Sequence, residues 1–148
     1  DRVDRHHRLR ALLELDRQST TWGYVIAELD VDDHAAVLEV LDQRGWLYLF
    51  DGRGNGPRPP LELPRSLLDL DDDPYRSLVW KLKQEGLIKP QRQIPYHEFR
   101  WGSWLRSRPL PPFSSRHLNP ALIPARSLVC SQAASGMPGW KGDGKKCR

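Results

Sequence analysis

The residues with the clearest potential for chemistry lie near the start of the chain. They are Asp4, Arg5, His6, His7 and Arg8. Asp4 is a good N-cap, because its carboxylate accepts hydrogen bonds from the free N–H groups of a helix's first turn. Those N–H groups, the helix dipole and the guanidiniums of Arg5 and Arg8 together attract a phosphate. Imidazoles exchange protons near neutral pH, so His6 and His7 are candidate catalytic residues. We predict a phosphate site here, with Asp4, Arg5 and Arg8 as its binding residues.

Two other interpretations of this turn stay open. Charged first turns are common on solvated helices, so the arginines could be surface residues and either histidine structural. The two histidines with Asp4 could also hold zinc or manganese, because imidazole and carboxylate suit both ions. A third ligand would then come from His34 or His117. We predict no defined metal site, and the question of a divalent metal cofactor stays open.

Local patterns in the first half of the chain predict two helices and two strands. Apolar residues at helical spacing predict a helix from about residue 5 to 17. A β-branched and aromatic run predicts a strand at 24–29, and a short apolar run predicts another at 46–50. Asp33 can cap a second helix, which Gly45 ends. The residues that would seat the first helix on a core are Leu9, Leu12 and Leu13.

The second half is predicted to be helical. A glycine- and proline-rich stretch at 51–60 is a surface loop, because prolines follow its glycines where a phosphate-binding helix would have to begin. Asp73 followed by Pro74 is a strong helix start, which explains the neighbouring aspartates without a metal. An aromatic-rich helix is predicted at 96–106. Pro124 should make a last helix start late or kink.

Composition and charge narrow the class of protein. The chain has 148 residues, which suits one domain or one domain with a tail. No apolar run approaches the roughly 18 residues that a membrane span needs. The net charge is +4, but basic residues gather at 2–10, at 76–108 and in the C-terminal tail, apart from acidic clusters at 28–42 and 69–73. This uneven pattern favours a local phosphate contact over a long nucleic-acid track.

The cellular compartment stays open at this stage. Cys130 and Cys147 match no zinc spacing. They could form a disulfide in an exported protein or remain two thiols in a cytoplasmic one. The chain opens without Met, so we interpret it as a fragment or a processed product that could have lost a signal peptide. Its localisation and oligomeric state are therefore unknown.

Three segments resemble the ParB-like nuclease branch of the ParB/sulfiredoxin superfamily, in the family's order: the Asp-x-His-His motif at 4–12, Asp-Asp-Pro-Tyr-Arg-Ser-Leu at 72–78, and the aromatic-rich stretch at 96–106. The resemblance implies an α+β fold, a small mixed sheet with packed helices and a helix-rich C-terminal half. The strand that normally precedes the first motif is absent apart from Arg2 and Val3. The implied division is a ParB-like domain at 1–108, a helical extension packed on it at 109–140 and a flexible basic tail at 141–148.

The resemblance also implies roles for single residues. In the superfamily a Gly-x-x-Arg turn at a helix N-terminus holds nucleotide phosphates, and here Arg5 replaces the glycine while Arg8 is the arginine. The reactive cysteine of sulfiredoxins falls at His6, so sulfinic-acid reductase chemistry is not expected. Arg76, in the second shared motif, is the candidate for a second phosphate-binding clamp. Its alternative role is a salt bridge to one of the preceding aspartates.

We therefore predict a domain that binds a phosphate-bearing ligand, nucleic acid or nucleotide, and hydrolyses a phosphodiester. His97 and Glu98 are a further candidate pair for proton transfer. The main alternative is a non-catalytic nucleotide- or DNA-binding module, in which arginines contact phosphate and the histidines are structural. A third is a structural relative without a ligand. The residues alone do not decide between an enzyme and a binding module.

Overall fold

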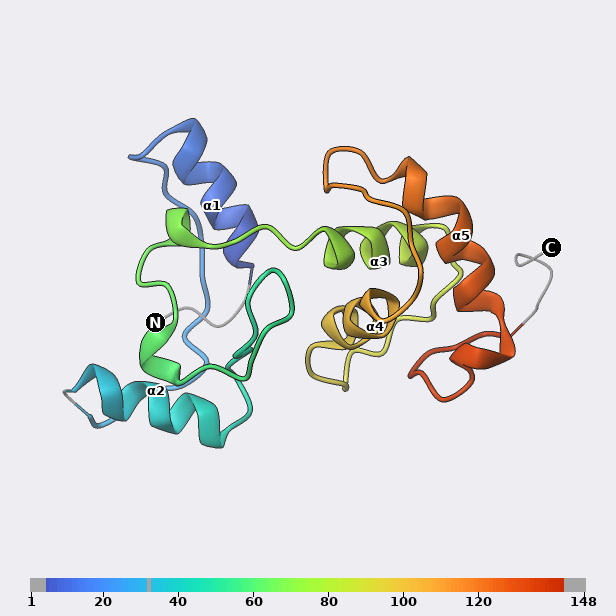
Figure 1. Ribbon diagram of the computed structural model, residues 1–148. Helices are drawn as coiled ribbons and strands as arrows, with labels where there is room; N and C mark the ends of the chain where they lie inside the picture. Colours follow the sequence, from blue (N-terminus) through green and yellow to red (C-terminus); the bar gives the residue numbers. More distant parts are fainter. Residues whose placement is uncertain (1–4, 32, 143–148) are drawn as a thin grey trace. The chain divides into compact units, whose positions relative to one another are not determined.

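The computed structural model describes residues 5–31 and 33–142, and its regular elements are helices (Figure 1). Two compact units are formed: Asp1–Asp51 with Asn55–Asp71, and Gly52–Gly54 with Asp72–Arg148. We call them unit 1 and unit 2 and describe each by itself. The α-helices are α1 (His6–Leu15), α2 (His34–Gln43), α3 (Pro74–Gln84), α4 (His97–Arg106) and α5 (Asn119–Cys130). The 3-10 helices are η1 (Pro60–Glu62), η2 (Leu67–Asp69) and η3 (Gln132–Ala134).

The predicted α+β fold is wrong for the part of the chain that the structure describes. Its only β pairing is an isolated bridge between Ser114 and His117. The predicted strand at 24–29 exposes its large side chains, 96% of Tyr24, 80% of Val25 and 60% of Ile26. Residues 46–50 likewise form no strand. A β-favouring sequence becomes a strand only when a neighbouring strand pairs with it, and neither segment has one here.

Unit 1 is held together by two helices that each pack on a short 3-10 helix, α1 on η2 and α2 on η1. The prediction for α2 is confirmed: the Asp33 carboxylate accepts a hydrogen bond from Ala36 N at 3.2 Å, and Gly45 adopts a φ of +66° just after the helix. Among its described residues, only Leu38 and Leu41 have buried side chains. Unit 1 therefore has a small core.

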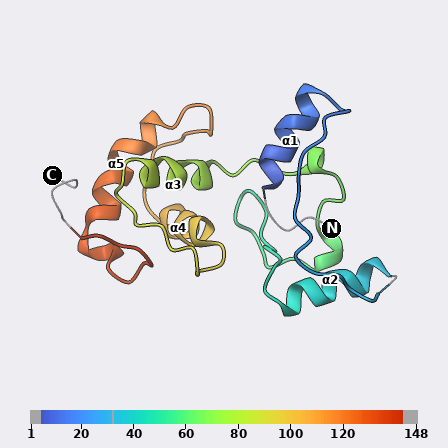
Figure 2. The same cartoon turned by 180° about the vertical axis from the view of Figure 1, so that it is seen from behind.

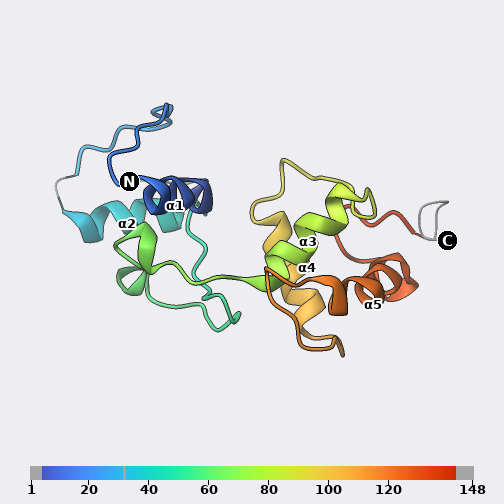
Figure 3. The same cartoon turned by 90° about the horizontal axis from the view of Figure 1, so that it is seen from above.

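Helices α3, α4 and α5 pack together in unit 2, as the views from behind (Figure 2) and from above (Figure 3) both show. The predicted start of α3 is confirmed, because Asp73 Oδ1 accepts hydrogen bonds from Tyr75 N at 3.0 Å and Arg76 N at 3.2 Å. Helix α5 begins at Asn119 and retains Pro124 in its interior. Among the described residues, the largest fully buried side chains all lie in this unit: Trp101, Leu78, Leu82, Ile88, Leu105, Val79 and Val129.

The segment after α5 is fastened back onto the helices of unit 2. The carbonyl oxygen of Pro138 lies 2.9 Å from His97 Nε2 and accepts a hydrogen bond from Trp101 Nε1 at 2.8 Å. Lys89 N donates to the carbonyl of Gly139 at 2.8 Å. Cys130 is disulfide-bonded, whereas Cys147 lies outside the described residues. Within the described ranges, no helix is both long and apolar enough to cross a membrane.

Candidate functional site

The predicted phosphate site lies at the start of α1, and the backbone there differs from the expected cap. Asp4 lies outside the described residues. The residue that precedes the helix is Arg5, whose φ of 60° and ψ of 25° are left-handed. Its carbonyl accepts hydrogen bonds from Arg8 N at 3.0 Å and Leu9 N at 3.1 Å. L-residues other than glycine avoid this conformation, so the backbone at Arg5 is strained.

Most side chains at the start of α1 are exposed. Arg5, His7 and Arg8 are exposed, and His6 is half-buried. The helix has no buried residue, although Leu9 and Leu13 are half-buried on the side that packs on η2. Leu9, Leu12 and Leu13 were expected to pack α1 on a core. The first and last of them are only partly buried, and Leu12 is 36% exposed. Two guanidiniums and two imidazoles lie together on one accessible helical turn.

Arg76, the predicted second clamp, belongs to α3 in unit 2. Its guanidinium lies over the ring of Phe99, with Cζ 5.5 Å from the ring centroid. Asp73, one of its predicted salt-bridge partners, accepts a hydrogen bond from the Arg76 backbone and pairs instead with the guanidinium of Arg106. The role of Arg76 as a phosphate clamp stays a prediction.

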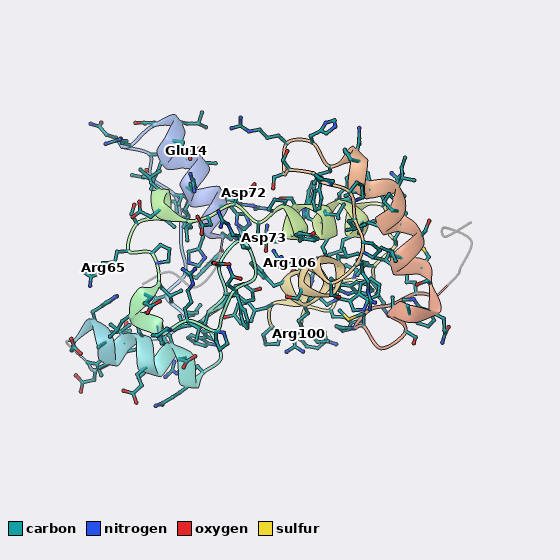
Figure 4. The ribbon with its side chains drawn as sticks, in the orientation of Figure 1. Glu14, Arg65, Asp72, Asp73, Arg100 and Arg106 are labelled. Carbon is teal, nitrogen blue, oxygen red and sulfur yellow. The ribbon has the colours of Figure 1, made fainter. Side chains whose placement is uncertain are left out.

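Arg106 is the centre of a cluster that the sequence interpretation missed. Its Nη2 donates to Asp73 Oδ1 and to the carbonyl of Gly52, both at 3.0 Å, and its guanidinium lies over the Tyr75 ring at 4.6 Å (Figure 4). A Cβ atom on Gly54 would come within 2.7 Å of Arg106 Nη1. The side chain thus connects residues 52–54 to the start of α3 within unit 2. The sequence signal that could have indicated this cluster is the position of Arg106 at the end of the third shared motif, 96–106.

The structure does not bring together the further candidate pair, His97 and Glu98, because each side chain has a separate partner. His97 is buried and directs its Nε2 at the carbonyl of Pro138, whereas Glu98 accepts a hydrogen bond from Lys83 Nζ. Burial by itself would raise the pKa of Glu98, but the hydrogen bond from Lys83 and the charges of Lys83 and Arg76 lower it. Successive helical residues point about 100° apart, which is why the two side chains diverge. Glu98 is a charged partner for Lys83 and a poor proton donor at neutral pH.

No group of three or more His, Cys, Asp or Glu side chains that could hold a metal ion occurs in residues 5–31 and 33–142. Both proposed third ligands, His34 and His117, are exposed. Asp4 lies outside those ranges, so a site formed by it with the two histidines of α1 stays a hypothesis. The side chains at the start of α1 suit anion binding and proton transfer in their own right.

Comparison with known proteins identifies a family and a similar crystal structure. A family model described as "Putative ParB-like nuclease" matches residues 2–107, which include α1 to α4. Protein Atu1540 from Agrobacterium tumefaciens has a similar crystal structure, with a TM-score of 0.83 and 31% sequence identity. That match covers 95% of this chain and 73% of the Agrobacterium chain. No curated protein matches.

Proposed function

Because the chain belongs to the ParB-like nuclease family, we propose that it binds a phosphodiester at the start of α1 and hydrolyses it. The observation that carries the proposal is the accessible first turn, in which Arg5, His7 and Arg8 are exposed and His6 is half-buried. Phosphate is the ligand that free helix N–H groups and guanidiniums bind best. The family description is the reason for preferring hydrolysis over binding alone.

The proposed chemistry assigns one task to each kind of group. Arg5 and Arg8 hold the non-bridging oxygens and stabilise the negative charge that grows as water attacks phosphorus. One imidazole, of His6 or His7, takes the proton from the attacking water. The other gives a proton to the leaving alkoxide, so that an ester P–O bond breaks as the new one forms. The proposed site uses the residues of unit 1 at the start of α1 alone.

The test measures hydrolysis of bis(4-nitrophenyl) phosphate and of a labelled oligonucleotide by purified protein, with and without added divalent metal. We expect His7→Ala and Arg8→Ala each to lower kcat/KM by about 100-fold, the usual loss of a proton-transfer or charge-stabilising group. The matched control is Arg17→Ala, which removes the same side chain as Arg8→Ala from an exposed position elsewhere in unit 1. Equal turnover by the site variants and the control would contradict the catalytic assignment.

A second candidate function, binding of a nucleotide or DNA without turnover, is favoured by the side chain of Arg5. It stands where the superfamily's glycine lets backbone approach a phosphate closely. In this case the wild-type protein shows no hydrolysis with any metal, yet binds phosphorylated ligands with an affinity that falls steeply as salt rises. The loss of that binding in Arg8→Ala, but not in His7→Ala, would separate this function from hydrolysis.

A further inference from the structure

A short segment after η3 closes over the start of α4. We call it the C-terminal strap and define it as residues 137–141. The carbonyl oxygen of Pro138 lies 2.9 Å from Nε2 of His97, and it also accepts a hydrogen bond from Trp101 Nε1 at 2.8 Å. The strap lies beyond residues 2–107, the part of the chain that the family model matches. Its contact with α4 is therefore a feature of this chain that the family match does not describe.

The C-terminal strap is fitted closely to unit 2 at three further points. Lys89 N donates to the carbonyl of Gly139 at 2.8 Å, and a Cβ atom on Gly139 would collide with the carbonyl oxygen of Lys89. Lys141 Nζ donates to the carbonyl of Gly86 at 2.8 Å. Trp140 packs against the hydrophobic core. Of all these contacts, the one with His97 is the contact whose donor titrates near neutral pH.

His97 is 3% exposed, and its ring has one hydrogen-bond partner where its protonated form would need two. A carbonyl oxygen can only accept, so the proton of the neutral ring is on Nε2. Nδ1 is buried and has no hydrogen-bond partner among the described residues. Protonation would create a second N–H group at Nδ1, and a buried donor without an acceptor is costly. Once the strap is released, water can solvate both N–H groups.

The charges around the ring also disfavour an imidazolium in the docked state. The charged side chains closest to the strap in the fold are Arg76, Lys83, Lys89, Glu98, Arg100 and Lys141. The one carboxylate among them, Glu98, is paired with Lys83, and Glu85 at the end of α3 is paired with Arg126. His97 is the first residue of α4, where the positive end of the helix dipole opposes a cation.

We infer that the C-terminal strap is a pH-sensitive closure of unit 2, held on α4 by neutral His97 and released when His97 is protonated. The docked state binds fewer protons than the released state, so docking is strong above neutral pH and weakens as the pH falls. Release withdraws Trp140 from the core and uncovers the Trp101 indole. The inference goes beyond the proposed hydrolysis and does not rest on it, because it uses no residue of α1.

The test is hydrogen exchange of the full chain followed by NMR at about pH 7.5 and 5.5, with rates corrected for the intrinsic pH dependence of exchange. The reporters are the Trp101 indole N–H and the Lys89 amide, which both donate to the strap. An imidazole in water titrates near pH 6.5, so the docking constant should fall about tenfold between the two pH values. We expect the protection of both reporters to fall by that factor. The Leu105 amide, in the last turn of α4, reports global unfolding and should change by less than about twofold.

Two variants identify the titrating group. His97→Gln places a neutral amide at this position that can still donate to the Pro138 carbonyl, so its reporters should keep the same protection at both pH values within about twofold. The matched control is His117→Gln, which removes an exposed histidine of the same unit. It should show the same fall of about tenfold as wild type.

A third variant tests the strap without changing His97. Gly139→Ala forces a Cβ against the Lys89 carbonyl at a position with a φ of +79°, so the strap should be released and both reporters unprotected at either pH. This variant, with His117→Gln, decides the question if His97→Gln does not fold. Equal protection of wild type at the two pH values overturns the inference. So does a fall in His97→Gln or Gly139→Ala as large as in wild type, or a matching fall at Leu105.

Discussion

Arg5 joins two properties that rarely occur in one residue, a left-handed backbone and a long cationic side chain. The left-handed conformation costs a residue with a Cβ about 1–2 kcal/mol, and glycine pays none of this. The strain at Arg5 is consistent with a side chain retained for binding, as strained residues often are at functional sites.

The substitution Arg5→Gly should therefore test the left-handed conformation through its effect on stability. Relief of the left-handed strain is offset by the extra chain entropy of glycine, about 0.5–1 kcal/mol, so we expect a free energy of unfolding equal to wild type or up to about 1 kcal/mol higher. Arg17→Gly, at an exposed position that lacks a positive φ, should instead lose up to about 1 kcal/mol. Urea unfolding measures both. An equal loss in the two variants would contradict the left-handed start of α1.

At the scale of elements, the confirmed predictions are the helix starts that depend on residues close together in the chain. Asp33 and Asp73 cap their helices through hydrogen bonds to residues at most three positions away. The segment at 24–29 has the residue types of a strand, but a strand also depends on a partner that local sequence does not specify. The helix start at Tyr96, with a φ of 54°, likewise departs from any local cap rule.

The contact between α3 and α5 gives a pH-dependent prediction. Glu85, at the end of α3, accepts hydrogen bonds from Arg126 of α5 at 2.7 and 2.8 Å. The hydrogen bond from Arg126 lowers the pKa of Glu85 below its ordinary value of 4.5, against the effect of burial. A pKa lower in the folded than in the unfolded protein stabilises the fold above the unfolded pKa. The stabilisation disappears as the pH falls through the folded pKa.

Arg126→Ala should therefore lower the free energy of unfolding at about pH 7 by no more than about 1 kcal/mol, since Arg126 is 45% exposed. As the pH falls through the folded pKa of Glu85, the difference from wild type should shrink towards zero, because Glu85 becomes protonated in both proteins. Denaturant unfolding followed as a function of decreasing pH measures this. NMR titration should also show a higher Glu85 midpoint in Arg126→Ala and no change in Arg116→Ala. An unchanged midpoint in both variants would exclude the ion pair in solution.

At the scale of the whole molecule, the parts of the candidate site that depend on local sequence could be predicted and the distant contacts could not. His6, His7 and Arg8 lie on one turn because they are adjacent in the chain. Arg106 contacts residues from 31 to 54 positions away, and no periodicity or cap rule specifies such contacts. The family motif includes Arg106, but it does not predict which residues the Arg106 side chain contacts.

The unequal cores of the two units predict unequal protection against hydrogen exchange. In unit 2, buried side chains from α3, α4 and α5 form one hydrophobic cluster, so their amides should open only in rare, large fluctuations. In unit 1, Trp22 is 99% exposed, and within the described residues the backbone of 24–29 forms no hydrogen bond to another backbone group. We expect amides at 20–29 to exchange at nearly the rate of an unfolded chain, those of α1 and α2 at intermediate rates, and those of α3 to α5 slowest. Exchange followed by mass spectrometry measures the order. Protection at 24–29 comparable to that of α4 would mean that this segment pairs with another strand in solution, and it would restore the sheet that these residue types favour.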